Sequence, residues 1–215
     1  MTREAAHPLL GYYRLHARLY DATRWSFLFG RERLVRLAAQ AVAGENGGQG
    51  RQVVEVGCGT GRNLRRLSRL LPGAGITGID LCPPMLARAR RALDGQNGRV
   101  RLACTAYGPA ALPAGSVDLI VFSYALSMFN PGFAEALEAA RDHLRPGGII
   151  AVTDFDVTPA PWFEAWMRVN HVRMEGHLRP AIAARFDVVH QSSHPAYGGL
   201  WRYFRLLGRT PGHGG

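Results

Sequence analysis

The chain has 215 residues, and all 26 of its positively charged side chains are arginine, because the sequence contains no lysine. With 16 acidic residues the formal net charge is +10, and the isoelectric point is about 10.5. The absence of lysine excludes a Schiff-base enzyme, a covalent pyridoxal phosphate site and a phosphate-binding loop of the Walker type. The positive charge favours anionic partners, either nucleic acid or an anionic membrane surface.

One domain with a sizeable core is expected, because the chain is about one and a half times as long as a typical domain of roughly 150 residues. Cys58, Cys82 and Cys104 form no CxxC pair, so we expect a reducing compartment, no disulfide framework and no metal site. No segment reaches the roughly 18 apolar residues that span a bilayer, and the first residues do not resemble a secretory signal. We therefore expect a cytoplasmic protein that meets a membrane only from its inner face.

In chain order, the hydrophobic pattern first predicts a helical arm over residues 9–43, which a Gly-rich linker over 44–50 separates from the rest. Strands are predicted at 52–57, 75–80, 99–104, 117–124 and 148–155. Between them, helices are predicted at 62–71, 85–93 and 133–144. The C-terminal part adds a helix over 162–174 and strands over 186–193 and 200–208. This alternation predicts an α/β fold with a doubly wound, mostly parallel sheet of seven strands. We divide the chain into an arm or lid (1–43) and a cofactor-binding domain (51–210).

Three glycines, Gly57, Gly59 and Gly61, follow the first strand directly and open a helix. The backbone N–H groups of such a loop and the start of the helix favour an anionic or polar ligand. A dinucleotide loop needs glycine at the sixth position, where Arg62 stands, so a nicotinamide cofactor is disfavoured. The pattern Glu55-x-Gly57-x-Gly59-x-Gly61 instead resembles motif I of the class I S-adenosylmethionine-dependent methyltransferases.

This resemblance implies a place for each part of S-adenosylmethionine. The loop would bend around the amino-acid end of the cofactor, and Asp80, at the tip of the second strand, would accept hydrogen bonds from both ribose hydroxyls. The alternative is a loop that is only a tight turn, with Asp80 capping the helix that begins near Pro84. Met85, in a segment that resembles the one following the acid in this family, would pack near the ribose or adenine.

After the third strand the family often carries an acidic residue for the adenine amine, and this chain departs from that pattern. Cys104 is followed by Thr105 and Ala106, and the Thr105 hydroxyl accepts at most a weaker hydrogen bond. Residues 145–148 (RPGG) resemble the turn before the family's fifth strand. The cofactor-binding residues that the resemblance implies are Glu55, Gly57, Cys58, Gly59, Gly61, Asp80, Leu81, Met85, Thr105, Ala106 and Ser123.

The segment after the fourth strand argues against a nucleobase as the substrate. Methyltransferases that act on nucleobase amines tend to carry an Asn/Asp-Pro-Pro-aromatic turn there, whereas this chain has SYALSMFNP over 123–131. The arm places tyrosines and a tryptophan among arginines, which suits a lipid interface, with Arg14, Arg18 and Arg24 on lipid phosphates. A lid over the cofactor pocket explains the arm equally well, and the two roles are compatible.

The arm, the glycine loop, the SYALSMF segment and the C-terminal aromatic segments together resemble the bacterial betaine-lipid methyltransferases over about residues 12–207. This resemblance implies successive N-methylation of the amine of diacylglyceryl-homoserine at an anionic membrane surface, with no specific nucleic acid partner. The alternatives are a phosphatidylethanolamine N-methyltransferase, a methyltransferase for RNA or a small metabolite, and a non-catalytic cofactor-binding module or membrane adaptor.

Methyl transfer from a sulfonium group depends mainly on positioning, because the methyl group is already activated. It needs a deprotonated amine, an approach of about 3 Å and exclusion of water. The faces of tyrosine rings would hold the increasingly methylated cation. The predicted cage consists of Tyr13, Tyr20 and Trp25 in the arm and Tyr124 at the end of the fourth strand.

Acidic residues at the end of the fifth strand are predicted to act on the amine. Asp154 or Asp156 would orient the ammonium or accept its proton, although a loop cap explains Asp156 equally well. His171 is a candidate base, but a packing role is favoured for an imidazole beside Trp166 and Val172. His190 and His194 are not expected to bind a metal, because they straddle a strand end.

Overall fold

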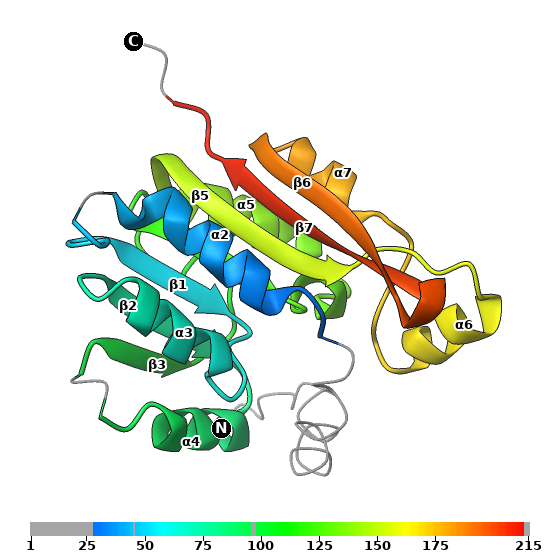
Figure 1. Cartoon of the computed structure of the whole chain (residues 1–215), viewed down its shortest axis with the longest axis horizontal. Helices are drawn as coiled ribbons and strands as arrows, with labels where there is room; N and C mark the ends of the chain where they lie inside the picture. Colours follow the sequence, from blue (N-terminus) through cyan, green and yellow to red (C-terminus); the bar gives the residue numbers. More distant parts are fainter. Residues whose placement is uncertain (1–27, 45, 96–97, 213–215) are drawn as a thin grey trace, which may run out of the picture.

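The computed structural model describes residues 28–44, 46–95 and 98–212, and a single sheet of seven strands runs through them (Figure 1). The strand order is β3-β2-β1-β4-β5-β7-β6, in which β1 to β5 are parallel and β7 is antiparallel to both of its neighbours. The strands are β1 (Gln52–Val56), β2 (Gly75–Asp80), β3 (Val100–Cys104), β4 (Val117–Ser123), β5 (Leu144–Phe155), β6 (Asp187–Ala196) and β7 (Trp201–Arg209). This confirms the predicted doubly wound, mostly parallel α/β sheet.

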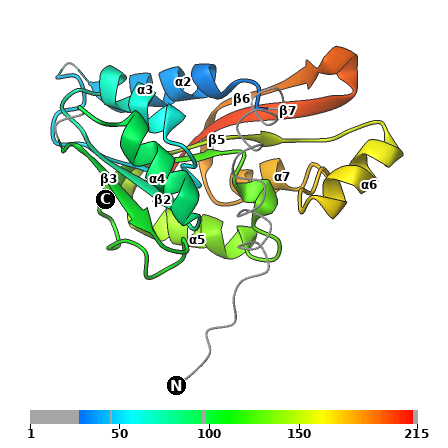
Figure 2. The same cartoon turned by 90° about the horizontal axis from the view of Figure 1, so that it is seen from below.

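Helices cover both faces of the sheet (Figure 2). On one face lie α2 (Arg31–Ala43), α3 (Arg62–Leu70) and α4 (Pro83–Ala92), and on the other lie α5 (Phe133–His143) and α7 (Leu178–Ala183). A further helix, α6 (Pro161–Val169), lies beyond the carboxyl end of β5, at the right of Figure 1. The described segments also contain the short 3₁₀ helices η1 (Leu126–Met128) and η2 (Tyr197–Gly199).

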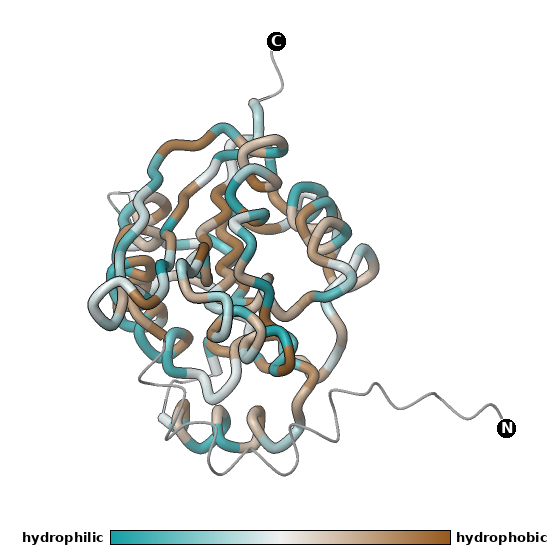
Figure 3. Tube along the Cα trace, turned by 90° about the vertical axis from the view of Figure 1, so that its right-hand side faces the viewer, coloured by the Kyte–Doolittle hydropathy of each residue, from teal (hydrophilic) through white to brown (hydrophobic). Residues whose placement is uncertain are grey.

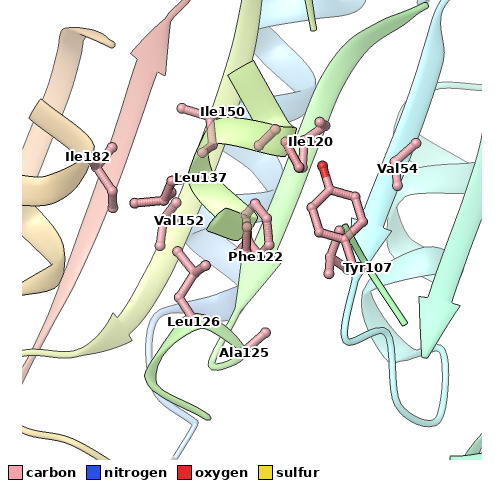
Figure 4. Packing of buried hydrophobic residues seen from close by; sticks show 14 of the residues in the cluster. Val54, Tyr107, Ile120, Phe122, Ala125, Leu126, Leu137, Ile150, Val152 and Ile182 are labelled. Atoms are coloured by element: carbon pink, nitrogen blue, oxygen red, sulfur yellow. The ribbon is translucent and has the colours of Figure 1, made fainter. Parts of the chain in front are cut away.

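Two hydrophobic clusters fill the space between the sheet and its helices. Successive residues of a strand point to opposite faces, so Leu119 and Val121 pack with α2 and α3, whereas Ile120 and Phe122 pack with α5. Figure 4 shows the second cluster, in which Phe122 lies close to Leu126 below β4 and β5. Because both faces are covered, β4 is apolar along nearly its whole length, as the uninterrupted run in the sequence predicts. Hydrophobic stretches of the chain accordingly run through the centre of the molecule (Figure 3).

The first helix of the described chain is part of this layered structure. Leu34, Val35 and Ala38 on α2 are fully buried against the sheet and α3. The Gly-rich segment that follows α2 therefore does not separate it from the sheet. The remainder of the predicted arm, residues 1–27, lies outside the described residues.

A buried carboxylate fixes the amino ends of three parallel strands. Asp118, at the start of β4, accepts a hydrogen bond of 2.8 Å from the backbone N–H of Gln52 in β1. The same side chain forms ion pairs with Arg51, at 2.8 Å, and Arg145 in β5, at 3.1 Å. These contacts join the strands at their amino ends, and the candidate active site lies at their carboxyl ends.

Two elements differ from the sequence-based prediction. The RPGG segment, expected to form a turn, belongs to β5, which begins at Leu144 and pairs with β4 through an irregularity between Val117 and Leu119. The predicted helix over 162–174 ends at Val169, since His171 adopts a left-handed backbone with φ of 60°. The short helix α7 was not predicted, because six residues are too few to show a clear period.

Candidate active site

A cavity of about 580 Å³ opens at the carboxyl ends of β1, β2 and β4. This is the edge where loops of an open parallel α/β sheet form binding crevices. The loops after these strands and after β3 line the cavity. Ten of the eleven predicted cofactor-binding residues lie in this lining: Glu55, Gly57, Cys58, Gly59, Asp80, Leu81, Met85, Thr105, Ala106 and Ser123. Their contact with a cofactor stays a prediction, but the fold does bring them together.

The glycine loop needs its glycines for backbone shape and close packing. Gly57 and Gly59 have positive φ angles of 69° and 54°, which side chains rarely adopt. A Cβ atom on Gly57 would lie only 2.9 Å from that of Ala125 in the loop after β4. Gly61, the eleventh residue, does not line the cavity; it precedes α3, and a Cβ there would lie 3.1 Å from that of Ala89 on α4.

Asp80 joins the loops that follow β1 and β2. Its Oδ2 accepts a hydrogen bond of 2.7 Å from the backbone N–H of Gly59, and its Oδ1 accepts one of 2.8 Å from that of Cys82. Cys82, and not Asp80, stands at the N-cap position of α4, and no side chain caps the helix there. A carboxylate has about four acceptor positions, so Asp80 retains capacity for hydroxyl groups of a ligand in the cavity.

Glu55 presents an unusual carboxylate at the cavity wall. Only 1% of the residue is exposed, and Oε1 accepts a hydrogen bond of 2.8 Å from Nδ2 of Asn63. Within the described residues, Oε2 is buried without a hydrogen-bond partner. Burial raises the pKa of Glu55 to about 8, although the nearby Arg31 opposes this shift. An unpartnered acceptor next to a cavity fits a ligand group that donates hydrogen bonds and carries positive charge.

Arg31 also lines the cavity, although it was not predicted as a site residue. Its Nε donates a hydrogen bond of 3.2 Å to the carbonyl oxygen of Leu28, and burial together with the charge of Arg62 lowers its pKa. A guanidinium at this position suits an anionic group of a ligand. Asn63 and Tyr107, which were not predicted either, line other parts of the wall.

Tyr124 is in the cavity lining as predicted, and it also anchors the segment before α2. Its hydroxyl donates a hydrogen bond of 2.9 Å to the carbonyl oxygen of Phe29. The side chain is buried, its backbone has a φ of 55°, and its ring packs edge-on against that of Phe155. Burial raises the pKa of Tyr124 well above its ordinary value, so the hydroxyl is a donor and not a base near neutral pH.

The predicted acidic residues at the end of β5 do not line the cavity. Asp154 is completely buried and accepts hydrogen bonds from the backbone N–H groups of Ser127, at 3.1 Å, and Phe155, at 2.8 Å. It therefore holds the turn that carries η1, and direct contact with a substrate stays a prediction. Asp156 forms an ion pair with Arg179 at 3.0 Å and accepts a hydrogen bond of 3.0 Å from the hydroxyl of Ser193, so its action on a substrate amine stays a prediction.

The remaining predicted residues lie elsewhere. His171 is exposed and does not line the cavity. Among the described residues no group of three or more His, Cys, Asp or Glu side chains is arranged to hold a metal ion, and no described helix is long and apolar enough to cross a bilayer. Tyr13, Tyr20 and Trp25 of the predicted cage, and the arm arginines Arg14, Arg18 and Arg24, lie outside the described residues.

Comparison with known proteins shows what the chain is similar to. Residues 53–148 match the family described as methyltransferase domain. The fold is similar to that of the cyclase SpnF, with a TM-score of 0.77, 19% identity and 95% of each chain covered. It is also similar to the N-methyltransferase NodS from Bradyrhizobium japonicum in complex with S-adenosylhomocysteine, with a TM-score of 0.66, 19% identity and 84% and 85% of the two chains covered. Residues 53–148 are thus similar to a methyltransferase domain, and the chain has the fold of the class I methyltransferases.

Curated relatives of the methyltransferase domain act on different compounds. The chain is 36% identical over 161 residues to the trans-aconitate 2-methyltransferase of Azoarcus sp. (strain BH72), covering 70% of this chain and 59% of that protein. It is 29% identical over 136 residues to the demethylmenaquinone methyltransferase of Thermus thermophilus, covering 63% of this chain and 61% of that protein. The chain thus spans about three fifths of the length of these relatives.

The structural matches confirm the predicted fold, and the names of the family and of the curated relatives agree with the predicted class of enzyme. The S-adenosylhomocysteine in the NodS structure agrees with S-adenosylmethionine as the predicted cofactor of the methyltransferase domain. The names of the relatives described above do not indicate a betaine-lipid substrate.

Proposed function

We propose that the protein binds S-adenosylmethionine in the cavity at the carboxyl ends of β1, β2 and β4 and transfers its methyl group to the amine of diacylglyceryl-homoserine. The buried, unpartnered Oε2 of Glu55 is the observation that carries the cofactor assignment. In this proposal it accepts hydrogen bonds from the ammonium of the methionine moiety. The guanidinium of Arg31, on the same wall, compensates the negative charge of the carboxylate of that moiety.

The other end of the cavity suits a nucleoside. Asp80 is held by two backbone N–H groups and has acceptor capacity for the two ribose hydroxyls. Next to it, the apolar Leu81 is 41% exposed although it lines the cavity, and the buried Met85 lies on the same side. An exposed leucine beside a polar anchor suits the face of a planar base. Thr105 and Ala106 line the region where the adenine amine would lie.

The bound cofactor supplies a sulfonium methyl group that needs no further activation. The protein's own residues then have to orient the amine, exclude water and stabilise the positive charge of the substrate. Tyr124 meets these needs in the described lining, because its ring forms part of the wall and its hydroxyl is engaged by Phe29. A fixed aromatic ring favours a methylated ammonium through its quadrupole, and this attraction grows when the site is dry.

The lipid nature of the substrate is supported by two surface properties. Trp162 and Trp166, on one face of α6, are 66% and 50% exposed, and Val169 is 79% exposed. Tryptophan side chains are favoured at the level of lipid headgroups, where the ring is partly desolvated and the indole N–H stays hydrated. The formal net charge of +10 favours an anionic surface. These properties support association with the inner face of a membrane.

The experiment is an incubation of the protein with labelled S-adenosylmethionine and vesicles that contain diacylglyceryl-homoserine, with headgroup masses as the readout. We expect mono-, di- and trimethylated lipid, and much less product from a variant with Asp80→Ala. Parallel reactions contain phosphatidylethanolamine or trans-aconitate. Label only in one of these compounds would reject the headgroup assignment but keep methyl transfer, whereas absence of cofactor binding in calorimetry would reject the site itself.

A further inference from the structure

A second cleft, of about 630 Å³, lies beside the cofactor cavity, between the amino-terminal parts of α2 and α3 and the strand β7. We call it the arginine cleft. Leu28, Arg31, Arg62 and Asn63 line both the arginine cleft and the cofactor cavity, so the two spaces adjoin. The arginine cleft has no part in the cofactor assignment given above, apart from these shared residues.

Arginines from three separate elements line the arginine cleft. Helix α3 contributes four arginines at positions i, i+3, i+4 and i+7, which form one face of the helix: Arg62, Arg65, Arg66 and Arg69. Helix α2 adds Arg31 and Arg33, and β7 adds Arg205. Exposure to solvent explains why one face of a single helix carries several arginines. It does not explain why arginines of two other elements line the same cleft.

The positive charge of the arginine cleft is largely uncompensated in the described chain. Glu32 is the only acidic residue of the described lining, and it pairs with Arg66 at 2.5 Å. Arg205 contacts Nε2 of His194, and its buried Nε has no hydrogen-bond partner among the described residues. An imidazole is either neutral or positively charged, so His194 does not compensate the arginines.

Residues 1–27, which precede the arginine cleft in the sequence, are not an acidic segment. They contain four arginines and two acidic residues, which is a formal net charge of +2. In addition, α2 and α3 each begin after a glycine, Gly30 and Gly61, that provides no capping side chain. The first N–H groups of both helices therefore add positive potential at this place.

We propose that the arginine cleft is a binding site for phosphate groups. Guanidinium groups bind phosphate oxygens in a bidentate manner, and one phosphate can bridge arginines that would otherwise repel each other. Several guanidiniums from different elements fit a ligand with more than one phosphate, or neighbouring phosphates on a surface. The sources of this chemistry are anionic lipid headgroups and soluble polyphosphates. The proposal does not depend on methyl transfer.

The experiment measures binding of the full-length protein to two probes, with variants matched in charge. The first probe is a vesicle of phosphatidylglycerol and phosphatidylcholine, with pure phosphatidylcholine as its reference, and the second is inorganic tripolyphosphate in calorimetry. The test variant combines Arg65→Gln and Arg69→Gln, which line the arginine cleft but not the cofactor cavity. The control combines Arg36→Gln and Arg141→Gln, two exposed arginines that do not line the arginine cleft.

We expect the test variant to bind the phosphate-bearing probe at least roughly tenfold more weakly than the unmodified protein, since each arginine near an anionic surface strengthens binding about several-fold. The control variant should lose much less, and both variants should keep their affinity for S-adenosylhomocysteine, which shows that they fold. Binding to vesicles alone identifies lipid phosphates as the ligand, and binding to both probes identifies phosphate in general. Equal losses in the two variants, or no binding of either probe by the unmodified protein, would overturn the proposal.

Discussion

The carboxylate of Asp80 accepts a 2.7 Å hydrogen bond from the backbone N–H of Gly59, so the acid that ends β2 is joined to the loop that follows β1. Its second oxygen is held by the N–H of Cys82 at 2.8 Å. Both bonds form within the protein itself, so the carboxylate is oriented before a ligand enters. Such preorganisation lowers the entropy cost of binding.

Replacing Asp80 with alanine should weaken cofactor binding strongly. The Asp80→Ala change removes the proposed acceptor of the ribose hydroxyls and releases the N–H groups of Gly59 and Cys82. Because hydrogen bonds to a charged group contribute about 1.5–3 kcal/mol, the dissociation constant for S-adenosylhomocysteine should rise at least roughly tenfold. Isothermal titration calorimetry measures it. Asp94→Ala, at an exposed position after α4, is the control and should bind normally; equal affinity in all three proteins would contradict the assignment.

Glu55 should make the stability of the ligand-free protein depend on pH. The pKa of this buried carboxyl is raised from 4.5 to about 8, so the folded protein holds its proton more tightly than the unfolded chain does. As the pH rises from about 4.5 to 8, the unfolded chain loses this proton first and is favoured, so the free energy of unfolding falls. The loss by pH 8 is on the order of 4 kcal/mol. Urea denaturation at several pH values should show that the free energy of unfolding of the Glu55→Gln variant lacks this fall. If the free energy of unfolding of the two proteins changes with pH in the same way, the raised pKa of Glu55 is refuted.

Cofactor binding should cause Glu55 to lose its proton. An ammonium group next to Oε2 favours the carboxylate, so its pKa should fall and binding near pH 7 should release a proton. Calorimetry with S-adenosylhomocysteine in two buffers of different ionisation enthalpy measures this proton. The Glu55→Gln variant should release none.

The sequence predicted well which residues meet at this cavity, because its signals are local. A glycine spacing after an apolar strand, and an acid at the end of the next strand, lie within short stretches whose geometry the backbone determines. Arg31 was missed for the opposite reason. Three arginines, at 31, 33 and 36, occur on the same predicted helix, and only the packing of α2 on the sheet decides that the first of them faces the cavity.

Asp154 shows what an argument from strand ends leaves out. Its place at the end of a central strand predicts contact with the substrate, much as the place of Asp80 predicts contact with the cofactor. The chain after β4, however, folds back as η1 and places the N–H of Ser127 on this carboxylate. The sequence contains no clear signal for this turn, since three residues of 3₁₀ helix have no recognisable period.

Tyr124 should show separable contributions from its hydroxyl and its ring. Tyr124→Phe removes the hydrogen bond to Phe29 and should lower the free energy of unfolding by about 1 kcal/mol. It keeps the ring in the cavity wall, so kcat/KM for the lipid amine should change little. Tyr124→Leu removes the ring and should lower kcat/KM roughly tenfold. Steady-state kinetics at saturating cofactor measures both. A larger effect in the phenylalanine variant would indicate that the hydroxyl acts on the substrate.

The aromatic face of α6 should insert at a lipid interface. Trp162 and Trp166 are exposed by 66% and 50%, while Phe163 and Met167 on the same helix are buried in the adjoining cluster. The double change Trp162→Ala and Trp166→Ala therefore removes surface contacts without emptying the core, and the thermal stability should be retained. Because each large aromatic side chain contributes on the order of 2 kcal/mol when desolvated, binding to anionic vesicles should weaken at least roughly tenfold.

Fluorescence provides a direct readout of this insertion, since emission shifts to the blue when exposed indole rings leave water for the interface. The shift on addition of vesicles should be present in the unmodified protein and greatly reduced in the double variant. The matched control replaces exposed Val188 and Val189 on β6 with alanine, which removes apolar surface from a different place. If the control loses vesicle binding as much as the α6 variant does, or if the emission of the unmodified protein stays constant, α6 does not contact the lipid.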